Sequence, residues 1–309
     1  MILVGGENLV DLVPAPQVRP GELGALLPLP GGGPYNVAIT VGRLTGPVRF
    51  LSKLSTDAFG EALLQRLQMS GVDTSMVQRG PEPTTLAVPG IGPDGATRYS
   101  FYCEGTADRE VRHPGPLPDD VQILSLGTNS LVLEPGASVY ERLLREHTGL
   151  SVLDPNIRPF LIADPDAYRA RFASWLPDIG LLKLSIEDAA WLADGDPLPA
   201  VKAWLSQGPA AVVLTRGADG IAVFTASGAD VMVPTPPATV IDTIGAGDTV
   251  HGALLYWLHN SGLDTTEALR GVDVDEWRNA LDFAARAAAV TVSRAGAEPP
   301  YAAELAGQP

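Results

Sequence analysis

The segment Asp242-Thr-Ile-Gly245-Ala-Gly247-Asp248 places two carboxylates and two glycines close together in the sequence. An extended, valine-containing stretch precedes it, and an apolar pattern typical of a helix follows it. A glycine loop that leads into a helix presents unpaired backbone N–H groups and the positive end of the helix dipole, which together favour an anion. A carboxylate beside such an anion hole can take the proton from a hydroxyl group while that oxygen attacks phosphorus. The segment therefore predicts phosphoryl transfer with Asp248 as proton acceptor, although an aspartate at a helix start is more often an ordinary cap.

Three further segments have residue types that could contact a small polar ligand. Gly31-Gly-Gly-Pro-Tyr-Asn36 precedes a predicted helix, so its backbone lets a ligand approach, and a flexible turn is the alternative. Asp154-Pro-Asn-Ile-Arg158 ends a predicted strand, at the edge where open α/β sheets bind ligands. Thr215-Arg-Gly-Ala-Asp-Gly220 joins two apolar strands and by itself predicts a tight hairpin. Asp11 follows the first predicted strand, where a single carboxylate is most often a surface residue.

Other phosphate-binding and catalytic motifs are not supported. The P-loop pattern is absent from the sequence. Gly90-Ile-Gly92-Pro-Asp-Gly95 has the spacing of a dinucleotide fingerprint, but it contains a proline and leads into a strand pattern, so we interpret it as a hairpin turn. The four histidines lack the spacing of a metal site, and no Gly-x-Ser-x-Gly elbow supports a hydrolase triad.

The composition excludes some classes of partner. The 309 residues include 21 Lys and Arg against 36 Asp and Glu, a formal net charge of −15. Nucleic acid is not an expected partner, because a protein that neutralises a phosphate backbone needs a basic face. A small anionic ligand is compatible with this charge, since backbone N–H groups and one or two arginines can hold it. The single cysteine, Cys103, cannot form an internal disulfide, and no apolar run is long enough to span a membrane, so we expect a cytoplasmic protein with no membrane partner.

The elements that must position these residues alternate between short apolar strands and longer helical patterns. The predicted strands cover residues 2–4, 48–51, 121–126, 151–153, 181–184, 211–214 and 221–224. The predicted helices cover residues 36–44, 59–70, 138–146, 187–193, 199–207, 249–259 and 276–292. This alternation predicts an α/β fold with a mostly parallel central sheet flanked by helices. We expect one domain over residues 1–309, in which the inserted segments 8–30 and 84–112 form a small β-sheet lid.

In this order, the motifs at residues 31–36, 154–158, 215–220 and 242–248 resemble those of the ribokinase-like (PfkB) carbohydrate kinases. The resemblance covers nearly the whole chain, and the 242–248 motif is highly specific for that family. The segment Gly6-Glu-Asn-Leu-Val-Asp11 and the aromatic strand at residues 98–102 are most similar to the fructokinase branch. The resemblance implies a ribokinase-like fold and the transfer of a phosphoryl group from ATP to a free sugar.

The resemblance also implies roles for individual residues. Asp248 would be the general base, and the anion hole would be formed by Gly245, Ala246 and Gly247. The residues that would contact the substrate are Asp11, Gly32, Gly33, Asn36, Phe101, Arg158 and Asp242. ATP would be held by Thr215, Gly217 and Gly220. Mg²⁺ would arrive with ATP, bound largely by phosphate and water, and K⁺ would bind the backbone carbonyls of Asp242 and Ile244.

Among sugars we expect fructose, with ketodeoxygluconate, ribose or a nucleoside as alternatives. Many relatives carry an arginine at the lid position that is Cys103 here, so the carboxylate of a sugar acid would lack this cation unless Arg98, Arg109 or Arg158 supplies one. A non-catalytic sugar or nucleotide sensor on the same fold is the alternative from a different class, and Asp248 argues against it because a sensor needs no base. The resemblance further implies a homodimer formed through the lid.

Overall fold

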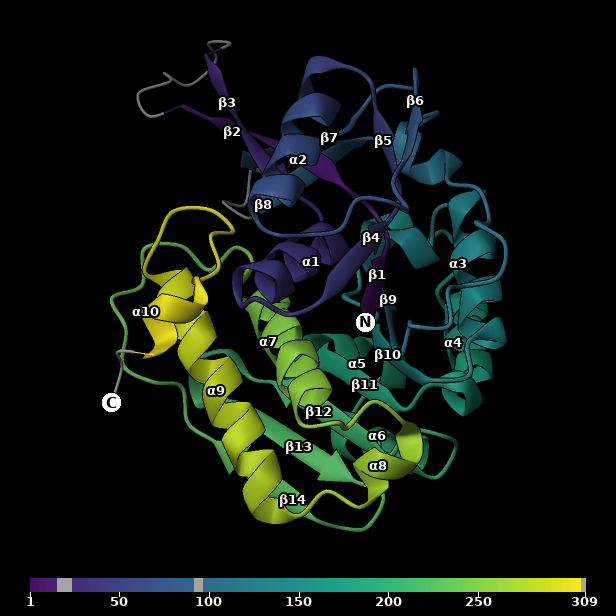
Figure 1. The fold of residues 1–309 in the computed structure, drawn as a ribbon, viewed down its shortest axis with the longest axis vertical. Coiled ribbons are helices and arrows are strands. Elements are labelled where there is room, and N and C mark those ends of the chain that lie inside the picture. The colour runs from purple at the N-terminus through teal and green to yellow at the C-terminus, as the bar shows by residue number, and fades with distance from the viewer. Residues whose placement is uncertain (16–23, 92–96, 307–309) are drawn as a thin grey trace.

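In the residues that the computed structural model describes (1–15, 24–91 and 97–306), eight strands form a central sheet. Their order is β14-β13-β12-β11-β10-β9-β1-β4 (Figure 1). The strands from β12 to β4 pair in parallel, whereas β13 pairs antiparallel with both β12 and β14. The strand bounds are β1 (Ile2–Gly5), β4 (Val48–Leu51), β9 (Ile123–Gly127), β10 (Leu150–Asp154), β11 (Leu181–Ser185), β12 (Ala211–Thr215), β13 (Ile221–Thr225) and β14 (Asp230–Val233). The predicted mostly parallel sheet is confirmed.

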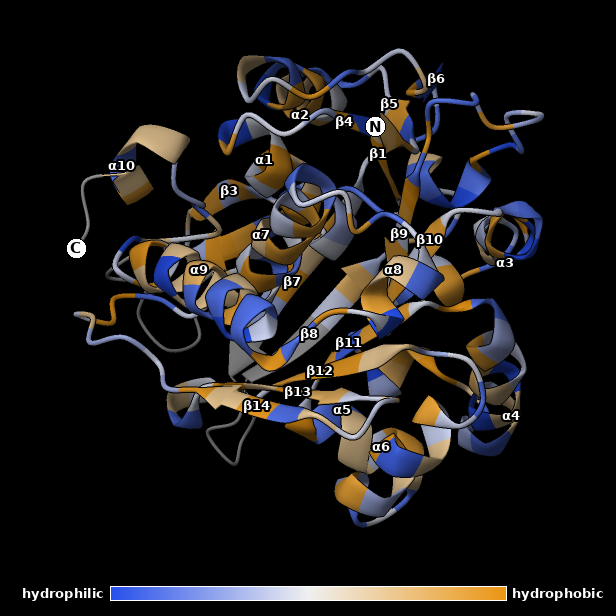
Figure 2. Ribbon diagram, turned by 60° about the horizontal axis from the view of Figure 1, so that its bottom comes forward, coloured by the Kyte–Doolittle hydropathy of each residue, from blue (hydrophilic) through white to orange (hydrophobic). Residues whose placement is uncertain are grey.

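Apolar side chains cover both faces of this sheet, as expected for buried parallel strands. On β1, Ile2 and Val4 belong to the core under α1, α7 and α9, whereas Leu3 belongs to the core under α3 to α6. Figure 2 shows α7 and α9 on one side of the hydrophobic strands β11 to β14, with α5 and α6 on the other. The helix bounds are α1 (Gly33–Arg43), α2 (Ala58–Met69), α3 (Gly136–Glu146), α4 (Pro165–Trp175), α5 (Ile186–Ala193), α6 (Pro197–Leu205), α7 (Ala246–Asn260), α8 (Thr266–Arg270), α9 (Val274–Val292) and α10 (Ala302–Ala306).

A second sheet, in the order β3-β2-β7-β8, is built from two segments that are far apart in the sequence (Figure 1). It consists of β2 (Leu9–Pro14), β3 (Leu26–Gly31), β7 (Thr85–Ile91) and β8 (Thr97–Tyr102). β2 pairs antiparallel with β3 and parallel with β7, so the parallel pair joins the two segments. The predicted small sheet is therefore present, and its closure as a lid stays a prediction.

The second predicted lid segment, about residues 84–112, continues beyond the end of β8 at Tyr102. Ala107–Glu110 forms a short 3₁₀ turn that is buried at Ala107 and Asp108 instead of extending the second sheet. The carboxylate of Asp108 accepts hydrogen bonds from the hydroxyls of Thr85 and Thr106, which fixes this turn at the base of β7. The predicted hairpin turn at residues 92–96, and residues 16–23 of the first lid segment, lie outside the described residues.

Some elements were not predicted. They are α4, β14, the short helices α8 and α10, and a small parallel pair formed by β5 (Lys53–Ser55) and β6 (Gln78–Gly80). In α4 the sequence did carry a signal, because Tyr168, Phe172 and Trp175 have helical spacing and are buried, and Asp164 caps the helix. The helices within the described ranges are all too short or too polar to cross a membrane.

Candidate active site

Helix α7 begins three residues before its predicted start, at a position that requires glycine. Gly245 is the N-cap residue with φ of 77°, and a Cβ there would lie 2.6 Å from the Cβ of Ala297. Gly247 lies in the first turn, and outside α7 and its adjacent residues a Cβ there would meet only Nζ of Lys183 among the described atoms, at 3.4 Å. The amide of Ala246 donates to the carbonyl of Thr243 at 3.3 Å, while the amides of Gly245 and Gly247 have no acceptor in the described part of the chain. These two amides are thus available to an anion.

Asp248 does not cap its own helix. Its Oδ2 accepts a hydrogen bond from Nδ2 of Asn36 at 2.8 Å, which joins α7 to α1. Burial raises the pKa of Asp248, and the hydrogen bond from Asn36 opposes this effect. The positive charges of Lys183 and Arg158 also lower this pKa. A half-buried carboxylate with a raised pKa, and with one oxygen that no donor in the described residues reaches, is suited to accept a proton.

The second sheet brings another carboxylate to the same region. Burial raises the pKa of Asp11, in β2, to about 6. The charge of Arg158 opposes this shift, and the charge of Asp248 adds to it, so the three charges are near enough to interact. Nη1 of Arg158 donates to Oδ1 of Asn156 at 2.9 Å, which keeps the guanidinium in its own loop. The structure therefore assembles four predicted site residues from four separate segments: Asp11, Asn36, Arg158 and Asp248.

The glycines before α1 permit close approach of the main chain. Gly32 has φ of 109°, and a Cβ there would lie 2.8 Å from the carbonyl oxygen of Glu7. At Gly33 a Cβ would lie 2.6 Å from Oγ1 of Thr128, and its amide donates to Oε1 of Glu7 at 3.2 Å. The predicted glycines thus let α1 begin against the ends of β1 and β9, and this placement brings Asn36 to Asp248.

Two residues with unusual backbone conformations border Gly33. Thr128 follows β9 with φ of 60°, and Asn156 follows β10 with φ of 39°. Nδ2 of Asn156 donates to Oγ1 of Thr128 at 3.4 Å. Such conformations cost on the order of 1–3 kcal/mol each and cluster at functional sites. Thr128 was not among the predicted site residues, and nothing in its local sequence indicates a left-handed backbone.

A buried lysine was also not selected. Lys183 lies in the apolar strand β11, is 4% exposed, and its Nζ is 2.7 Å from Oδ2 of Asp154. Nδ1 of His251 lies 3.4 Å from the same oxygen. A lysine inside an apolar run was a usable signal, because lysine is almost never fully buried without a partner.

An aromatic contact joins the second sheet to the main body. The rings of Phe101, in β8, and Phe160 have centroids 5.4 Å apart. Phe160 belongs to the 3₁₀ turn Pro159–Leu161, which directly follows Arg158. Phe101 was a predicted site residue. Phe160 was not predicted, because the position of Phe160 beside the second sheet depends on the tertiary fold.

Thr215, Gly217 and Gly220 lie where β12 turns back into β13, as the hairpin prediction required. Thr215 pairs with Ser185 of β11. A Cβ on Gly217 would meet nothing within 4 Å, so this residue borders open space. A Cβ on Gly220 would lie 2.0 Å from the carbonyl oxygen of Val233, so packing within the hairpin requires this glycine.

The carboxylate of Asp242 organises the loop before α7. Its Oδ1 accepts from the amide of Ile244 at 3.0 Å, and its Oδ2 accepts from the amide of Gly296 at 2.8 Å. The amide of Ile241 donates to the carbonyl of Val292 at 2.8 Å. The loop is thus fastened to the segment after α9, which also contributes Ala297 beside Gly245.

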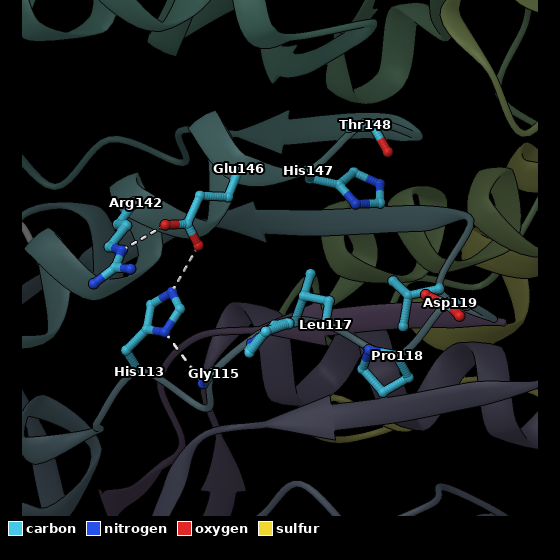
Figure 3. Close-up of a pocket in the computed structure, with 11 residues that line it drawn as sticks. His113, Gly115, Leu117, Pro118, Asp119, Arg142, Glu146, His147 and Thr148 are labelled. Atoms are coloured by element: carbon cyan, nitrogen blue, oxygen red, sulfur yellow. Dashed lines mark hydrogen bonds and ion pairs between the residues drawn. The ribbon is translucent and has the colours of Figure 1, made fainter.

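A hollow of about 530 Å³ elsewhere on the molecule shares no residue with this region (Figure 3). It lies between α3 and the segment 113–121, where His113 contacts Glu146 at 3.0 Å and Glu146 contacts Arg142 at 2.6 Å. These three side chains are thus paired with one another, and the residues of α3 that line the hollow, Arg142 and Glu146, come from the C-terminal half of that helix. The convergence of carboxylates, backbone amides and a buried lysine at α7 makes that region the candidate active site.

Comparisons with known proteins match this chain to carbohydrate kinases over nearly its whole length. The model of the pfkB family carbohydrate kinase matches residues 3–303. A fructokinase from Rhizobium leguminosarum bv. trifolii is 37% identical over 287 residues, which cover 91% of this chain and 87% of the relative. The solved structure of fructokinase with bound ATP from Xylella fastidiosa has a TM-score of 0.87 and 29% identity, and the match covers 98% and 97% of the two chains. A fructokinase double mutant from Vibrio cholerae O395, in a form with bound fructose, ADP and potassium ion, has a TM-score of 0.84 and 25% identity over 99% and 96% of the chains.

Proposed function

The chain belongs to the pfkB family of carbohydrate kinases, and we propose that it transfers the γ-phosphoryl group of ATP to a hydroxyl of fructose. The observation that carries this proposal is the pairing of Asp248 with Asn36 beside the amides of Gly245 and Gly247, which have no acceptor in the described residues. This arrangement places a proton acceptor next to an anion site, which is what the attack of a hydroxyl on a phosphoryl group requires.

In the proposed reaction, Asp248 takes the proton of the attacking hydroxyl. The sugar oxygen then forms its bond to the γ-phosphorus as the bond to the oxygen bridging the β- and γ-phosphates breaks, and ADP leaves. The amides of Gly245 and Gly247 stabilise the charge on the equatorial oxygens. Asp11, the Gly32–Gly33 backbone and Phe101 position the sugar, and Arg158 faces the substrate. The Asn36 hydrogen bond fixes the orientation of Asp248.

Three predicted residues are proposed to hold ATP. Gly217 borders open space just after Thr215, the last residue of β12, and Gly220 fixes the turn between them and β13. No group of three or more His, Cys, Asp and Glu that could hold a metal ion occurs among the described residues, which fits a Mg²⁺ bound mainly by phosphate and water. Mg²⁺ would neutralise phosphate charge. We also propose K⁺ at the backbone carbonyls of Asp242 and Ile244, in the loop that the Asp242 carboxylate fastens.

The surroundings of the lid position support a neutral sugar rather than a sugar acid. Cys103 is buried and its carbonyl accepts a hydrogen bond from Nη1 of Arg109 at 2.8 Å. Nη2 of the same arginine donates to the carbonyl of Glu134 at 2.8 Å, so this guanidinium is already engaged. Arg158 is held in its own loop, and the side chain of Arg98 lies outside the described residues. Arg158 is bonded to Asn156 and Lys183 is paired with Asp154, so a substrate carboxylate would face Asp11 and Asp248 with no unengaged cation among the described site residues.

The experiment that tests this function is a measurement of ADP release with ATP and a panel of fructose, ribose and ketodeoxygluconate. We expect kcat/KM to be highest for fructose, by tenfold or more. A tenfold preference for the acid corresponds to about 1.4 kcal/mol in transition-state binding and would contradict the proposed substrate. Sugar binding by calorimetry without any ADP release would instead support a sensor. The homodimer through the second sheet and the cytoplasmic location stay predictions.

A further inference from the structure

Lys183 is a buried cation in the middle of an apolar strand. Leu182 and Leu184 on either side are fully buried, and Lys183 itself is 4% exposed. Removing an ammonium group from water costs several kcal/mol unless a partner compensates it. The burial of the Lys183 ammonium group must therefore be compensated by its neighbours.

Behind Lys183 lies a fixed network of polar groups. Nζ of Lys183 contacts Oδ2 of Asp154 at 2.7 Å. Burial would raise the pKa of Asp154, but the charge of Lys183 and the hydrogen bond from His251 bring this pKa down to about 2. The other ring nitrogen of His251 lies 3.0 Å from Oγ of Ser125. The lysine is thus held in one place by an ionised carboxylate, which is itself held from α7 and β9.

In front of Lys183 lies the start of α7. Apart from the adjacent residues and the backbone of α7 itself, Nζ of Lys183 is the only described atom within 4 Å of the position that a Cβ on Gly247 would occupy, at 3.4 Å. The ammonium group therefore borders the residue that offers an unpaired amide to an anion. Asp248 follows directly in the sequence, and the charge of Lys183 acts on its carboxylate.

We propose that Lys183 supplies the fixed positive charge of the phosphoryl-transfer site, between the anion hole at Gly247 and the proton acceptor Asp248. In this role it strengthens the anion hole and favours the ionised form of Asp248, which can accept the hydroxyl proton. Asp154 and His251 are positioning residues that act through Lys183. This inference rests on the proposed phosphoryl transfer and adds a residue to its machinery.

The charges around Asp248 come from several elements. Lys183 on β11 and Arg158 in the loop after β10 favour its ionised form, whereas Asp154 at the end of β10 opposes it. Asp11 on β2 is coupled to it as well, and His251 lies on its own helix, in contact with Asp154. Asp188, at the start of α5, also feels the charge of Lys183 but is held by the amides of Ile157 and Ser185. In the pH profile of kcat, the fall at low pH (the acid limb) reports the protonation of Asp248. Removing Lys183 and removing Asp154 should therefore move this acid limb in opposite directions.

The test compares Lys183→Met with Asp154→Asn and with a matched control, Lys53→Met. Lys53 is also a buried lysine, 6% exposed, and pairs with Glu82 at 2.6 Å outside the candidate active site. Wild-type protein is first assayed with the sugar panel, and the best sugar is used throughout, so that a substrate other than fructose leaves this test intact. The measurements are kcat, the KM of the sugar, the pH profile of kcat, and Tm.

We expect Lys183→Met to lower kcat about 100-fold, with the sugar KM within threefold of wild type. Its acid limb should move to higher pH, and that of Asp154→Asn should move to lower pH because Lys183 keeps its charge. Lys53→Met should retain both kcat and the acid limb. If Lys183→Met fails to fold, the direction in which Asp154→Asn moves the acid limb of kcat tests the inference instead. The inference is overturned if the acid limb stays in place in both site variants, or if kcat of Lys183→Met falls no further than that of Lys53→Met.

Discussion

Asp248 is oriented by a single side chain that comes from a distant part of the sequence. Asn36 donates to Oδ2, and no donor in the described ranges reaches Oδ1, so one oxygen is available to a sugar hydroxyl. Because Asp248 is partly buried in the first turn of α7, its charge is also exposed to the helix dipole and to the neighbouring cations. The chemistry of the site therefore depends on the ionisation of this one carboxylate.

Replacing that carboxylate tests its role directly. Asp248→Asn should lower kcat by about 10²- to 10⁴-fold, because the amide cannot accept the proton, while sugar affinity stays within a few-fold. Steady-state kinetics and calorimetry measure the two effects. Asp275→Asn is a suitable control, since Asp275 also lies in the first turn of a helix, α9, but is 85% exposed and pairs with Arg278. Near-normal turnover in Asp248→Asn would show that Asp248 is not the proton acceptor.

Glu7 is a second residue whose ionisation affects the site. Its Oε1 accepts from the amide of Gly33, and its Oε2 accepts from the amide and hydroxyl of Ser130. Burial raises the pKa of Glu7 from 4.5 to about 7, although the hydrogen bonds from Ser130 oppose the shift. The hydroxyl of Ser130 also contacts the carbonyl of Gly127, so a protonated Glu7 could donate to Ser130 while Ser130 donates to that carbonyl.

The raised pKa predicts how stability depends on pH. Between about pH 4.5 and 7 the folded protein keeps the Glu7 proton that the unfolded chain has lost, so the free energy of unfolding falls as pH rises through this window. The contribution of Glu7 should decrease by roughly 3 kcal/mol in total, and be flat above pH 7. Urea unfolding of wild type and Glu7→Gln at several pH values measures it. The free energy of unfolding of wild type minus that of Glu7→Gln should fall as pH rises from about 4.5 to 7. A difference that does not change with pH would contradict the assignment.

At the scale of elements, the second sheet and the main body share the candidate site. β2 supplies Asp11 and β8 supplies Phe101, whereas Asn36, Asp248 and Arg158 come from the main body. The ring contact between Phe101 and Phe160 spans the same boundary. If sugar fills the space between these groups, binding should draw the second sheet closer and exclude water that would otherwise compete for the phosphoryl group.

Hydrogen exchange measures this closure. Fructose should slow amide exchange in β2, β3, β7 and β8, while α5 and α6, on the opposite face of the central sheet, provide the internal reference. Phe160→Ala should weaken this protection and raise the KM of fructose several-fold, because it removes one ring from the boundary. Sugar binding that leaves exchange in the second sheet unchanged would argue that it is a fixed wall rather than a lid.

At the scale of the whole molecule, the second sheet also carries exposed apolar side chains on its edge strands. Leu26 and Leu27 on β3 are 44% and 46% exposed, and Tyr102 on β8 is 63% exposed. Strands β3 and β8 are the two opposite edges of this sheet, and exposed edge strands are typical of surfaces that pair with another chain. These features support the predicted homodimer through the second sheet, in a protein whose net charge of −15 otherwise favours separation of copies.

Light scattering coupled to size-exclusion chromatography tests the homodimer. Wild type should elute with the mass of two chains, and Leu27→Glu should shift it towards one chain, because the carboxylate would be buried against the partner. Met232→Glu is the matched control, since Met232 is 53% exposed on β14, the edge of the other sheet. A wild-type protein that elutes as one chain at all concentrations would disprove the dimer.

The sequence by itself determined the features that depend only on residues close together in the chain. The glycine loop and the helix after it are local, so the segment 242–248 predicts both the backbone amides and the carboxylate beside them. The alternation of short apolar strands with helices is local too, and it predicts the central sheet, because such strands bury both faces only between two layers of helices. The strand at residues 48–51 was placed with its observed bounds for the same reason.

Only the tertiary structure decided which side chains meet. Asn36 and Asp248 are 212 positions apart, and their hydrogen bond exists because α1 and α7 pack side by side on one face of the sheet. The place of Lys183 beside Gly247 follows from the position of β11 within the strand order, and Thr128, whose backbone is left-handed, meets Gly33 only in the folded chain. Local patterns fix the period and the type of each element, whereas the distances between elements arise from the packing of the whole chain.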